Sequence, residues 1–260
     1  MLDCEKVLPY NDKEKKSQQV SRMFNAIAEK YDFFNHAMSF GLDFLWRHKA
    51  IKSLKKSHPK TMLDVATGTG DFALKAYSML RPDEIIGIDI SVEMMRVGAQ
   101  KVQKKGLQDK ISFSEQNCER LTFADNTFDA VTVSFGVRNF EHLEVAFREV
   151  CRVLKPGGEF VILELSEPDN WLVRWGYKIH SFVFIPLFGK LFSNDAKAYK
   201  YLPKSIAAFP KGEKMKSLLT SCGFSDIEYR KFTFGVCSFY KCKKKDIEAR
   251  IENHRPKGYI

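Results

Sequence analysis

The sequence lacks any long hydrophobic run, which excludes a membrane-spanning helix. Its longest apolar stretch covers only residues 182–188 and contains a proline, whereas a spanning helix needs roughly 20 apolar residues. The first 19 residues are polar and charged without an apolar core, so they do not resemble a secretory signal. We therefore expect the protein to remain in the cytoplasm.

Cysteine is scarce and scattered in this chain. There are six cysteines in 260 residues, with no Cys-x-x-Cys pair and no histidine nearby at a metal-binding spacing. We expect free, reduced thiols and no metal site. The chain also lacks internal repeats, and its only biased tract is the basic end that starts at Lys241.

Positive charge is in excess, with a formal net charge of +10 at neutral pH. Such a charge suits nucleic acid or an anionic membrane surface. The lysines are spread over three clusters, however, at residues 13–16, 52–60 and 241–245. This spread favours solvated lysines that keep the protein soluble, with a docking surface as the alternative.

Residues 61–165 alternate short β-branched runs with longer amphipathic segments, which is typical of βαβ units on a parallel sheet. Helix breakers and N-caps separate the segments, and the glycine at 106 suits a left-handed helix end. We expect strands at 61–66, 85–89, 111–115, 129–134 and 160–165, with helices at 71–80, 91–105 and 141–154, followed by a helix at 214–222 and strands at 227–232 and 236–240.

The chain should form one α/β domain with decorations. We expect a polar N-terminal tail at residues 1–20 and a single domain at 21–240. Residues 171–210 are rich in aromatic side chains at their start and should form an inserted helical cover. A basic tail should occupy residues 241–260.

Several candidate binding residues follow successive predicted strands. Gly68 and Gly70 come after the first strand, Asp89 ends the second, and Asn117 follows the third. In an open parallel sheet, ligands bind beyond the carboxyl ends of the strands. Asp89 could accept hydrogen bonds from ribose hydroxyls and Asn117 could contact an adenine edge. The order of these residues, more than any one of them, predicts a nucleoside-containing cofactor.

A dinucleotide is the nearest alternative, because Gly68, Gly70 and Ala73 formally satisfy the G-x-G-x-x-G/A pattern. Asp71 lies at the start of the following helix, where it would repel a pyrophosphate, and Asp64 adds a second negative charge. S-adenosylmethionine carries no phosphate but has an ammonium and a sulfonium, so acids around the turn favour it. Capping of the helix is the alternative role of Asp71.

Longer motifs resemble the signatures of the ubiquinone/menaquinone C-methyltransferase family, from about Phe24 to Tyr240. The glycine turn and the Lys-Pro-Gly-Gly turn occur in many methyltransferases and indicate only the fold. The N-terminal motifs and residues 134–139 are more specific. The matching segments are residues 31–36, 39–47, 64–71, 134–139, 152–160, 201–206 and 232–235.

The resemblance implies a class I S-adenosylmethionine-dependent methyltransferase fold, which is α/β and Rossmann-like. Its sheet has seven mostly parallel strands, with an N-terminal helical segment and an inserted helical cover. The implied reaction transfers a methyl group from S-adenosylmethionine to a ring carbon of demethylmenaquinol, giving menaquinol in menaquinone biosynthesis. The alternatives are a benzoquinol of ubiquinone biosynthesis, or another small aromatic or lipid substrate.

The implied partner is a lipid-tailed quinol and not nucleic acid. Methyltransferases of base amino groups usually carry an Asn/Asp-Pro-Pro-Tyr/Phe motif after the fourth strand, where this chain has Ser134-Phe135-Gly136-Val137. The intact glycine turn and Asp89 argue against a non-catalytic protein on this fold. Contact with the inner face of a membrane and a homodimer are left open.

Site residues carry over from the matching motifs. Asp64, Gly68 and Gly70 complete the predicted cofactor site around the glycine turn. By resemblance, the cofactor is also contacted by Thr69, Asp89, Asn117, Cys118 and Ser134.

Methylating a quinol carbon requires an electron-rich ring, so the enzyme must favour a phenolate. Arg138, with Asn139, follows the fourth strand, where its guanidinium could stabilise that charge. Tyr31 and His36 could close the other side, with His36 as a base. The alternatives are a surface ion pair between Arg138 and Glu141, and a structural role for His36.

The aromatic stretch from Trp171 to Phe192 has two interpretations. It could line an apolar channel for an isoprenoid tail, with Phe184 and Phe188 in contact with the tail. It could equally be ordinary core and lid packing.

Overall fold

A single seven-stranded sheet forms the centre of the computed structural model, which describes residues 1–10, 12–179 and 196–246. Along the sheet the strands run β3-β2-β1-β4-β5-β7-β6. The first five strands in sequence are parallel, and β7 is antiparallel to both of its neighbours. The strands are β1 (Thr61–Val65), β2 (Glu84–Asp89), β3 (Ile111–Glu115), β4 (Phe128–Ser134), β5 (Leu154–Leu165), β6 (Phe224–Phe232) and β7 (Cys237–Lys244).

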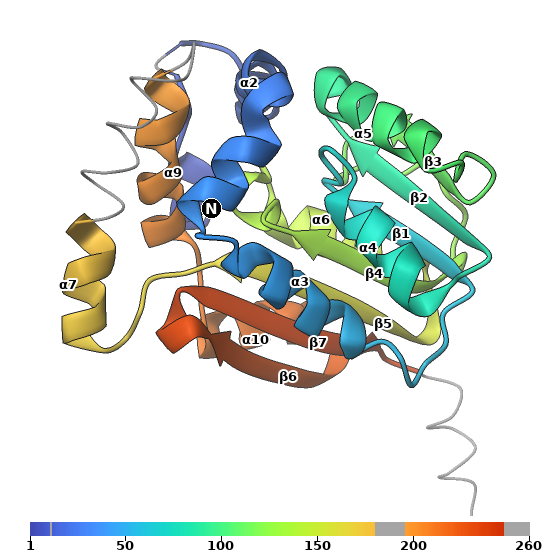
Figure 1. The fold of residues 1–260 in the computed structure, drawn as a ribbon. Coiled ribbons are helices and arrows are strands. Elements are labelled where there is room, and N and C mark those ends of the chain that lie inside the picture. Colours follow the sequence, from blue (N-terminus) through green and yellow to red (C-terminus); the bar gives the residue numbers. More distant parts are fainter. Residues whose placement is uncertain (11, 180–195, 247–260) are drawn as a thin grey trace, which may run out of the picture.

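Helices cover both faces of the sheet (Figure 1). Two short 3-10 turns, η1 (Val137–Asn139) and η3 (Thr233–Gly235), follow strands β4 and β6. This architecture confirms the predicted class I methyltransferase fold. The helices are α1 (Asp3–Lys6), α2 (Lys16–Met38), α3 (Leu42–Lys52), α4 (Asp71–Leu80), α5 (Val92–Lys104), α6 (Leu143–Val153), α7 (Trp171–Ile179), α9 (Ala196–Ala208) and α10 (Glu213–Ser221).

Local sequence signals set several of these boundaries as predicted. The Ser91 hydroxyl accepts a hydrogen bond from the backbone N–H of Met94 and so caps α5. Gly106 follows that helix with φ +63°, the left-handed conformation that a glycine adopts without steric cost.

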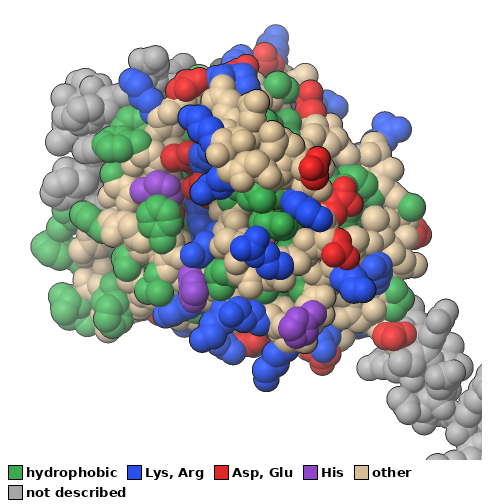
Figure 2. All heavy atoms as spheres, turned by 45° about the vertical axis from the view of Figure 1, so that its right-hand side comes forward, with side chains coloured by type: hydrophobic (Ala, Val, Ile, Leu, Met, Phe, Trp, Pro, Cys, Tyr) green, Lys and Arg blue, Asp and Glu red, His purple; other side chains and the backbone are tan. Residues whose placement is uncertain are grey.

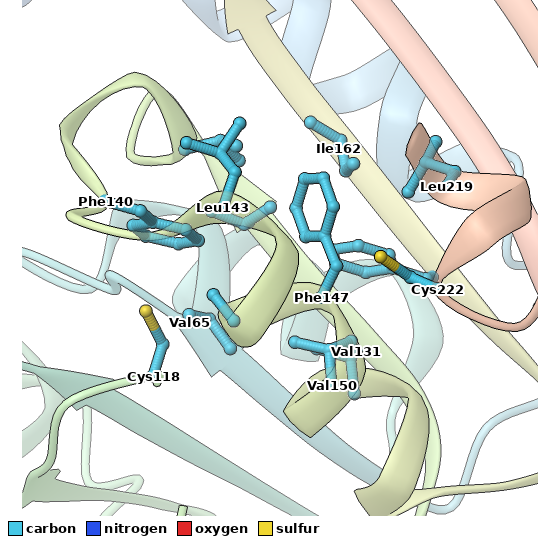
Figure 3. Packing of buried hydrophobic residues seen from close by; sticks show 14 of the residues in the cluster. Val65, Cys118, Val131, Phe140, Leu143, Phe147, Val150, Ile162, Leu219 and Cys222 are labelled. Carbon is cyan, nitrogen blue, oxygen red and sulfur yellow. The ribbon is translucent and has the colours of Figure 1, made fainter. Parts of the chain in front are cut away.

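Two apolar layers hold the helices on the sheet. On one face, Leu143, Phe147 and Val150 of α6 pack with Val131 and Ile162 of the sheet (Figure 3). On the other face, α3, α4 and α5 bury side chains against the sheet, including Trp46, Ile51, Phe72 and Val102. Because each helix buries one apolar stripe, the strand ends remain available for ligands.

The first 20 residues do not form the predicted polar tail. Cys4 is 0% exposed within the core, and α2 already begins at Lys16. The buried Lys16 ammonium donates hydrogen bonds to the carbonyl oxygens of Cys4, Arg138 and Phe140, at 2.7, 3.2 and 3.0 Å. Lys16 belongs to a lysine cluster that the sequence predicts to be solvated, but its side chain is buried and hydrogen-bonded inside the protein.

The basic tail was predicted to start at residue 241, but β7 continues to Lys244, so the first four of these residues belong to the sheet. Lys241 forms an ion pair with Glu159 at 2.8 Å, and Lys244 donates to the carbonyl oxygens of Arg152 and Leu154. Residues 247–260 lie outside the described part of the chain. The structure also starts β5 at Leu154, before the Lys-Pro-Gly-Gly turn and earlier than predicted.

The inserted cover is helical where the structure describes it, as α7 and α9. Phe184 and Phe188, predicted to contact an isoprenoid tail, lie outside the described residues. All six cysteines are unpaired, as predicted. Among the helices of the described ranges, none combines the length and apolar character needed to cross a membrane.

Candidate functional site

A cavity opens at the carboxyl ends of the parallel strands, beside α2. Helix α2 lies between α5 and α9 (Figure 1) and contributes Val20, Phe24 and Tyr31 to the lining. We call this the acidic cavity. Five of the predicted cofactor residues line it: Gly68, Asp89, Asn117, Cys118 and Ser134.

Asp89 joins the glycine turn to the second strand. Its carboxylate accepts hydrogen bonds from the backbone N–H groups of Gly68, at 2.8 Å, and Ser91, at 2.9 Å. Burial raises the pKa of Asp89, and the backbone N–H groups of Ser91, Gly68 and Ile90 oppose that rise. Because a carboxylate offers about four acceptor positions, Asp89 can still accept hydrogen bonds from ribose hydroxyls in the cavity.

Negative charge dominates this cavity. Three acids line it, Asp89, Glu119 and Glu141, and its described lining contains no lysine, arginine or histidine. A pyrophosphate would meet repulsion there without a basic partner, whereas an ammonium or sulfonium would be attracted. The cavity therefore fits S-adenosylmethionine and disfavours a dinucleotide.

The three remaining predicted cofactor residues lie behind the cavity and do not line it. Asp64 accepts hydrogen bonds from the hydroxyls of Thr67 and Thr132, at 2.7 and 2.6 Å. Burial raises the pKa of Asp64 to about 6, against the lowering effect of both hydroxyls. Gly70 is the N-cap of α4 with φ +75°, and the Thr69 hydroxyl donates to Asp32 at 2.5 Å. Gly70 and Thr69 belong to the glycine turn, and Asp64 holds the turn in place through the Thr67 hydroxyl.

Two non-glycine residues with positive φ bend the chain at the cavity. Ala66 follows β1 with φ 51°, and Phe135 follows β4 with φ 60°. A Cβ on Gly136 would lie 2.5 Å from the Cβ of Ala66. The two strand ends thus pack too closely for a side chain at position 136. Residues outside their preferred conformations cluster at binding sites, where surrounding contacts impose them.

His36 is not among the described residues that line either cavity, and its role as a base stays a prediction. Its Nδ1 lies 2.8 Å from Asp43 and its Nε2 3.4 Å from Asp71. The ring also stacks on Phe44, with centroids 4.2 Å apart. Carboxylates at both ring nitrogens and a stacked ring favour the structural role that was its alternative.

Asp71 takes part in the same network of charges and does not cap its helix. Its carboxylate lies 2.7 Å from the Lys101 ammonium and 3.6 Å from the Arg47 guanidinium. Because Lys101 and Arg47 offset the charge of Asp71, this residue repels a phosphate less than the acids that line the cavity do. Asp32, His36 and Asp71 are close enough to suggest a metal site, but the Lys101 ammonium already contacts both aspartates.

A second, larger cavity adjoins the first. We call it the apolar cavity because aliphatic and aromatic side chains of α2, α3, α7 and α9 make most of its lining. Phe24, Tyr31 and Phe135 line both cavities. A group held in one cavity can therefore reach the other past these three rings. Further lining residues include Ile27, Met38, Leu42, Val173, Tyr177, Leu202 and Ile206.

Among the described residues that line the apolar cavity, Arg138 is the one with a positive charge. It is 5% exposed, and its guanidinium donates to Glu164 at 2.6 Å and to the carbonyl of Phe135 at 2.5 Å. The alternative of a surface ion pair with Glu141 is wrong, because Glu141 accepts hydrogen bonds from Ser17 instead. Glu164 was not predicted, although an acid within an apolar strand is a signal for a buried partner.

Asn139 and two tyrosines complete the junction between the cavities. The Tyr201 hydroxyl donates to the Asn139 side-chain oxygen at 3.1 Å. Burial raises the pKa of Tyr201 and of Tyr31, against the lowering effect of the nearby Arg138 charge. Both phenols therefore stay protonated at neutral pH. Tyr201 begins the matching segment at residues 201–206, but the sequence does not predict its hydrogen bond to Asn139, which lies 62 residues away along the chain.

Comparison with known proteins shows the family of the chain. The model of the ubiE/COQ5 methyltransferase family matches residues 12–244. A demethylmenaquinone methyltransferase of Bacteroides fragilis is 51% identical over 240 residues, which cover 92% of this chain and 98% of the relative. The enzyme of that name from Porphyromonas gingivalis is 44% identical, with the same coverage.

More distant relatives and solved structures extend the likeness. A ubiquinone/menaquinone biosynthesis C-methyltransferase UbiE of Pseudomonas fluorescens is 39% identical, covering 87% of this chain and 89% of the relative. A structure of an S-adenosylmethionine-dependent methyltransferase from Thermotoga maritima superposes with a TM-score of 0.61 at 18% identity, covering 86% of this chain and 99% of that one. At that identity the superposition shows the fold alone.

The geometry of Asp89 predicts a specific loss in Asp89→Ala. Removing charge-assisted hydrogen bonds to the ribose should weaken S-adenosylmethionine binding by roughly 1.5–3 kcal/mol, measured by calorimetry. Asp129 is a matched control, because it also accepts two backbone N–H bonds, from Lys60 and Thr61 at 2.9 Å each, but does not line the cavity. Asp129→Ala should lose stability and keep cofactor affinity. Equal affinity in both folded variants would exclude Asp89 as a ligand.

Proposed function

The chain belongs to the ubiE/COQ5 methyltransferase family, and we propose that it methylates a ring carbon of demethylmenaquinol to give menaquinol. It is an S-adenosylmethionine-dependent C-methyltransferase. Relatives named for demethylmenaquinone are more similar to it than the relative named for both quinones, at 51% and 44% against 39% identity. This order favours the naphthoquinol over the benzoquinol.

The pair of adjoining cavities is the observation that supports this function best. One is acidic and suits a cationic nucleoside, while the other is apolar and larger. A lipid-tailed quinol has an aromatic head and an isoprenoid tail, so most of its surface needs an apolar lining. The rings of Phe24, Tyr31 and Phe135 line both cavities, so methyl transfer between the two substrates would take place beside them.

The residues of the chain orient both substrates and favour negative charge on the ring. Bound S-adenosylmethionine supplies an electrophilic methyl group. Asp89 and Asn117 line the acidic cavity, where they would hold the nucleoside end. The Arg138 guanidinium favours a phenolate on the quinol, so the ring hydroxyl loses its proton to water more readily and the ring carbon becomes more nucleophilic. Alignment for in-line transfer supplies the remaining acceleration.

A methyl-transfer assay tests the proposed substrate. Labelled S-adenosylmethionine is offered with a demethylated naphthoquinol or a benzoquinol that carries the same isoprenoid tail. We expect kcat/KM to favour the naphthoquinol by at least about tenfold, a difference of about 1.4 kcal/mol in transition-state binding. Preference for the benzoquinol would assign the chain to the ubiquinone branch, and labelling of neither quinol would reject both.

Arg138→Met should lower kcat by about 10²–10³, as expected when a preorganised charge is lost, while the affinity for S-adenosylmethionine stays the same. The single variant also leaves the carboxylate of Glu164 buried without its partner, which can cost about 3–5 kcal/mol of stability. The double variant Arg138→Met, Glu164→Gln removes both charges and should recover stability but not kcat.

Recovery of kcat in that double variant would contradict the proposed role. It would mean that Arg138 serves only to neutralise Glu164. The measurements are thermal unfolding, cofactor calorimetry and steady-state kinetics on the same three proteins.

We further propose that the apolar cavity opens towards a membrane surface. Large side chains near its lining are exposed: Phe40 by 81%, Trp171 by 76%, Trp175 by 65% and Phe234 by 80%. Figure 2 shows apolar side chains gathered on the left of one face, with Lys and Arg side chains scattered over its middle and lower part. Aromatic side chains beside basic ones suit the interface of an anionic bilayer, from which a lipid-tailed quinol could enter.

Co-sedimentation with vesicles of mixed zwitterionic and anionic lipid tests this contact. We expect the wild-type chain to bind and the Trp171→Ser, Trp175→Ser variant to bind about tenfold less, because two exposed aromatic surfaces no longer enter the interface. Val145, which is 45% exposed on α6 and does not line the apolar cavity, provides a control at another exposed apolar side chain. Equal binding of the tryptophan variant and Val145→Ser would contradict the proposed surface.

A further inference from the structure

Asn35 carries a buried amide nitrogen that has no hydrogen-bond partner among the described residues. The residue lies on α2, one turn after Tyr31, and lines the apolar cavity. A buried and unpaired amide donor costs about 1–3 kcal/mol relative to a paired one. Such donors are rare in folded proteins, and a functional role is one recognised reason for them.

Two other side-chain amides of the same helix, those of Asn25 and Gln19, are hydrogen-bonded within the protein. The Asn25 oxygen accepts hydrogen bonds from the Ser91 hydroxyl, at 2.7 Å, and from the Glu93 backbone N–H, at 3.2 Å. Gln19 accepts a hydrogen bond from the Tyr10 N–H and donates one to the Glu14 carbonyl. The amides of Asn25 and Gln19 therefore have partners within the protein. The unpaired amide nitrogen belongs to Asn35, a residue that lines the apolar cavity.

A second unpaired donor lines the same cavity. The Nε of Arg138 is also buried without a hydrogen-bond partner in the described part of the chain. Most of the surrounding lining is apolar and offers no acceptor to either group. Two open donors in an apolar cavity suit a flat aromatic ligand that carries two oxygen atoms on its ring.

We propose that Asn35 is a specificity-determining residue, which donates a hydrogen bond from Nδ2 to one ring oxygen of the quinol. The inference rests on the proposed function and extends it. Arg138 takes the oxygen whose negative charge activates the ring carbon, and Asn35 takes the other oxygen. The pair fixes the rotation of the ring in its plane, so that one carbon faces the rings shared with the acidic cavity.

The test compares a tailed naphthalene-1,4-diol with the tailed 1-naphthol that lacks the second oxygen. The ratio of their kcat/KM values is measured for the wild type and for Asn35→Leu, which has a similar volume but no donor. We expect the ratio to fall by about tenfold in the variant, because only the diol loses a hydrogen bond. The affinity for S-adenosylmethionine should not change, and the Tm of the ligand-free protein should not fall.

Asn25→Leu is the matched control, since it removes an amide from the same helix whose hydrogen bonds are satisfied within the protein. It should lower the Tm and leave the substrate ratio at its wild-type value. An unchanged ratio in Asn35→Leu would overturn the inference, and so would a loss of Tm equal to that of Asn25→Leu. Absence of methyl transfer by the wild type to either compound would instead reject the proposed function, while the Tm comparison would still test the open amide.

Discussion

The buried ammonium of Lys16 anchors the helix on which both cavities depend. Its three N–H groups match three carbonyl oxygens, one in α1 and two in the loop after β4. Burial lowers the pKa of Lys16 to about 8, and nearby acids and the Cys4 thiol oppose that change. A buried charge is tolerated only when its hydrogen bonds are satisfied. The contact therefore fixes the start of α2 directly against the loop that carries Arg138.

From this anchor α2 forms the wall of both cavities. Its Phe24 and Tyr31 line each of them, and together with Phe135 they divide an acidic space from an apolar one. The division suits two substrates of opposite character, one cationic and polar and the other lipid-tailed. Arg138 is the cation beside the junction, and Glu164 holds it in place at 2.6 Å.

The sequence predicted the features that depend on local pattern. Strand ends, the glycine turn and the position of Asp89 follow from hydrophobic periodicity and turn residues, because each involves neighbours within one βαβ unit. Contacts across long stretches of chain were not predictable. The partner of Arg138 is 26 residues away, and Lys16 reaches carbonyls more than 120 residues away. His36 was suggested as a base from its place in the N-terminal motif, and the sequence could not show that carboxylates of α3 and α4 contact both of its ring nitrogens.

The central claim is that methyl transfer occurs past the aromatic wall between the two cavities. The most direct measurement is a crystal structure of the ternary complex with S-adenosylhomocysteine and a demethylated naphthoquinol. The account predicts the adenosyl group beside Asp89 and Asn117, the isoprenoid tail along α2 and α9, and the acceptor carbon facing the sulfur past Phe24, Tyr31 and Phe135. A quinol ring that binds away from this wall, or that occupies the acidic cavity, would contradict it.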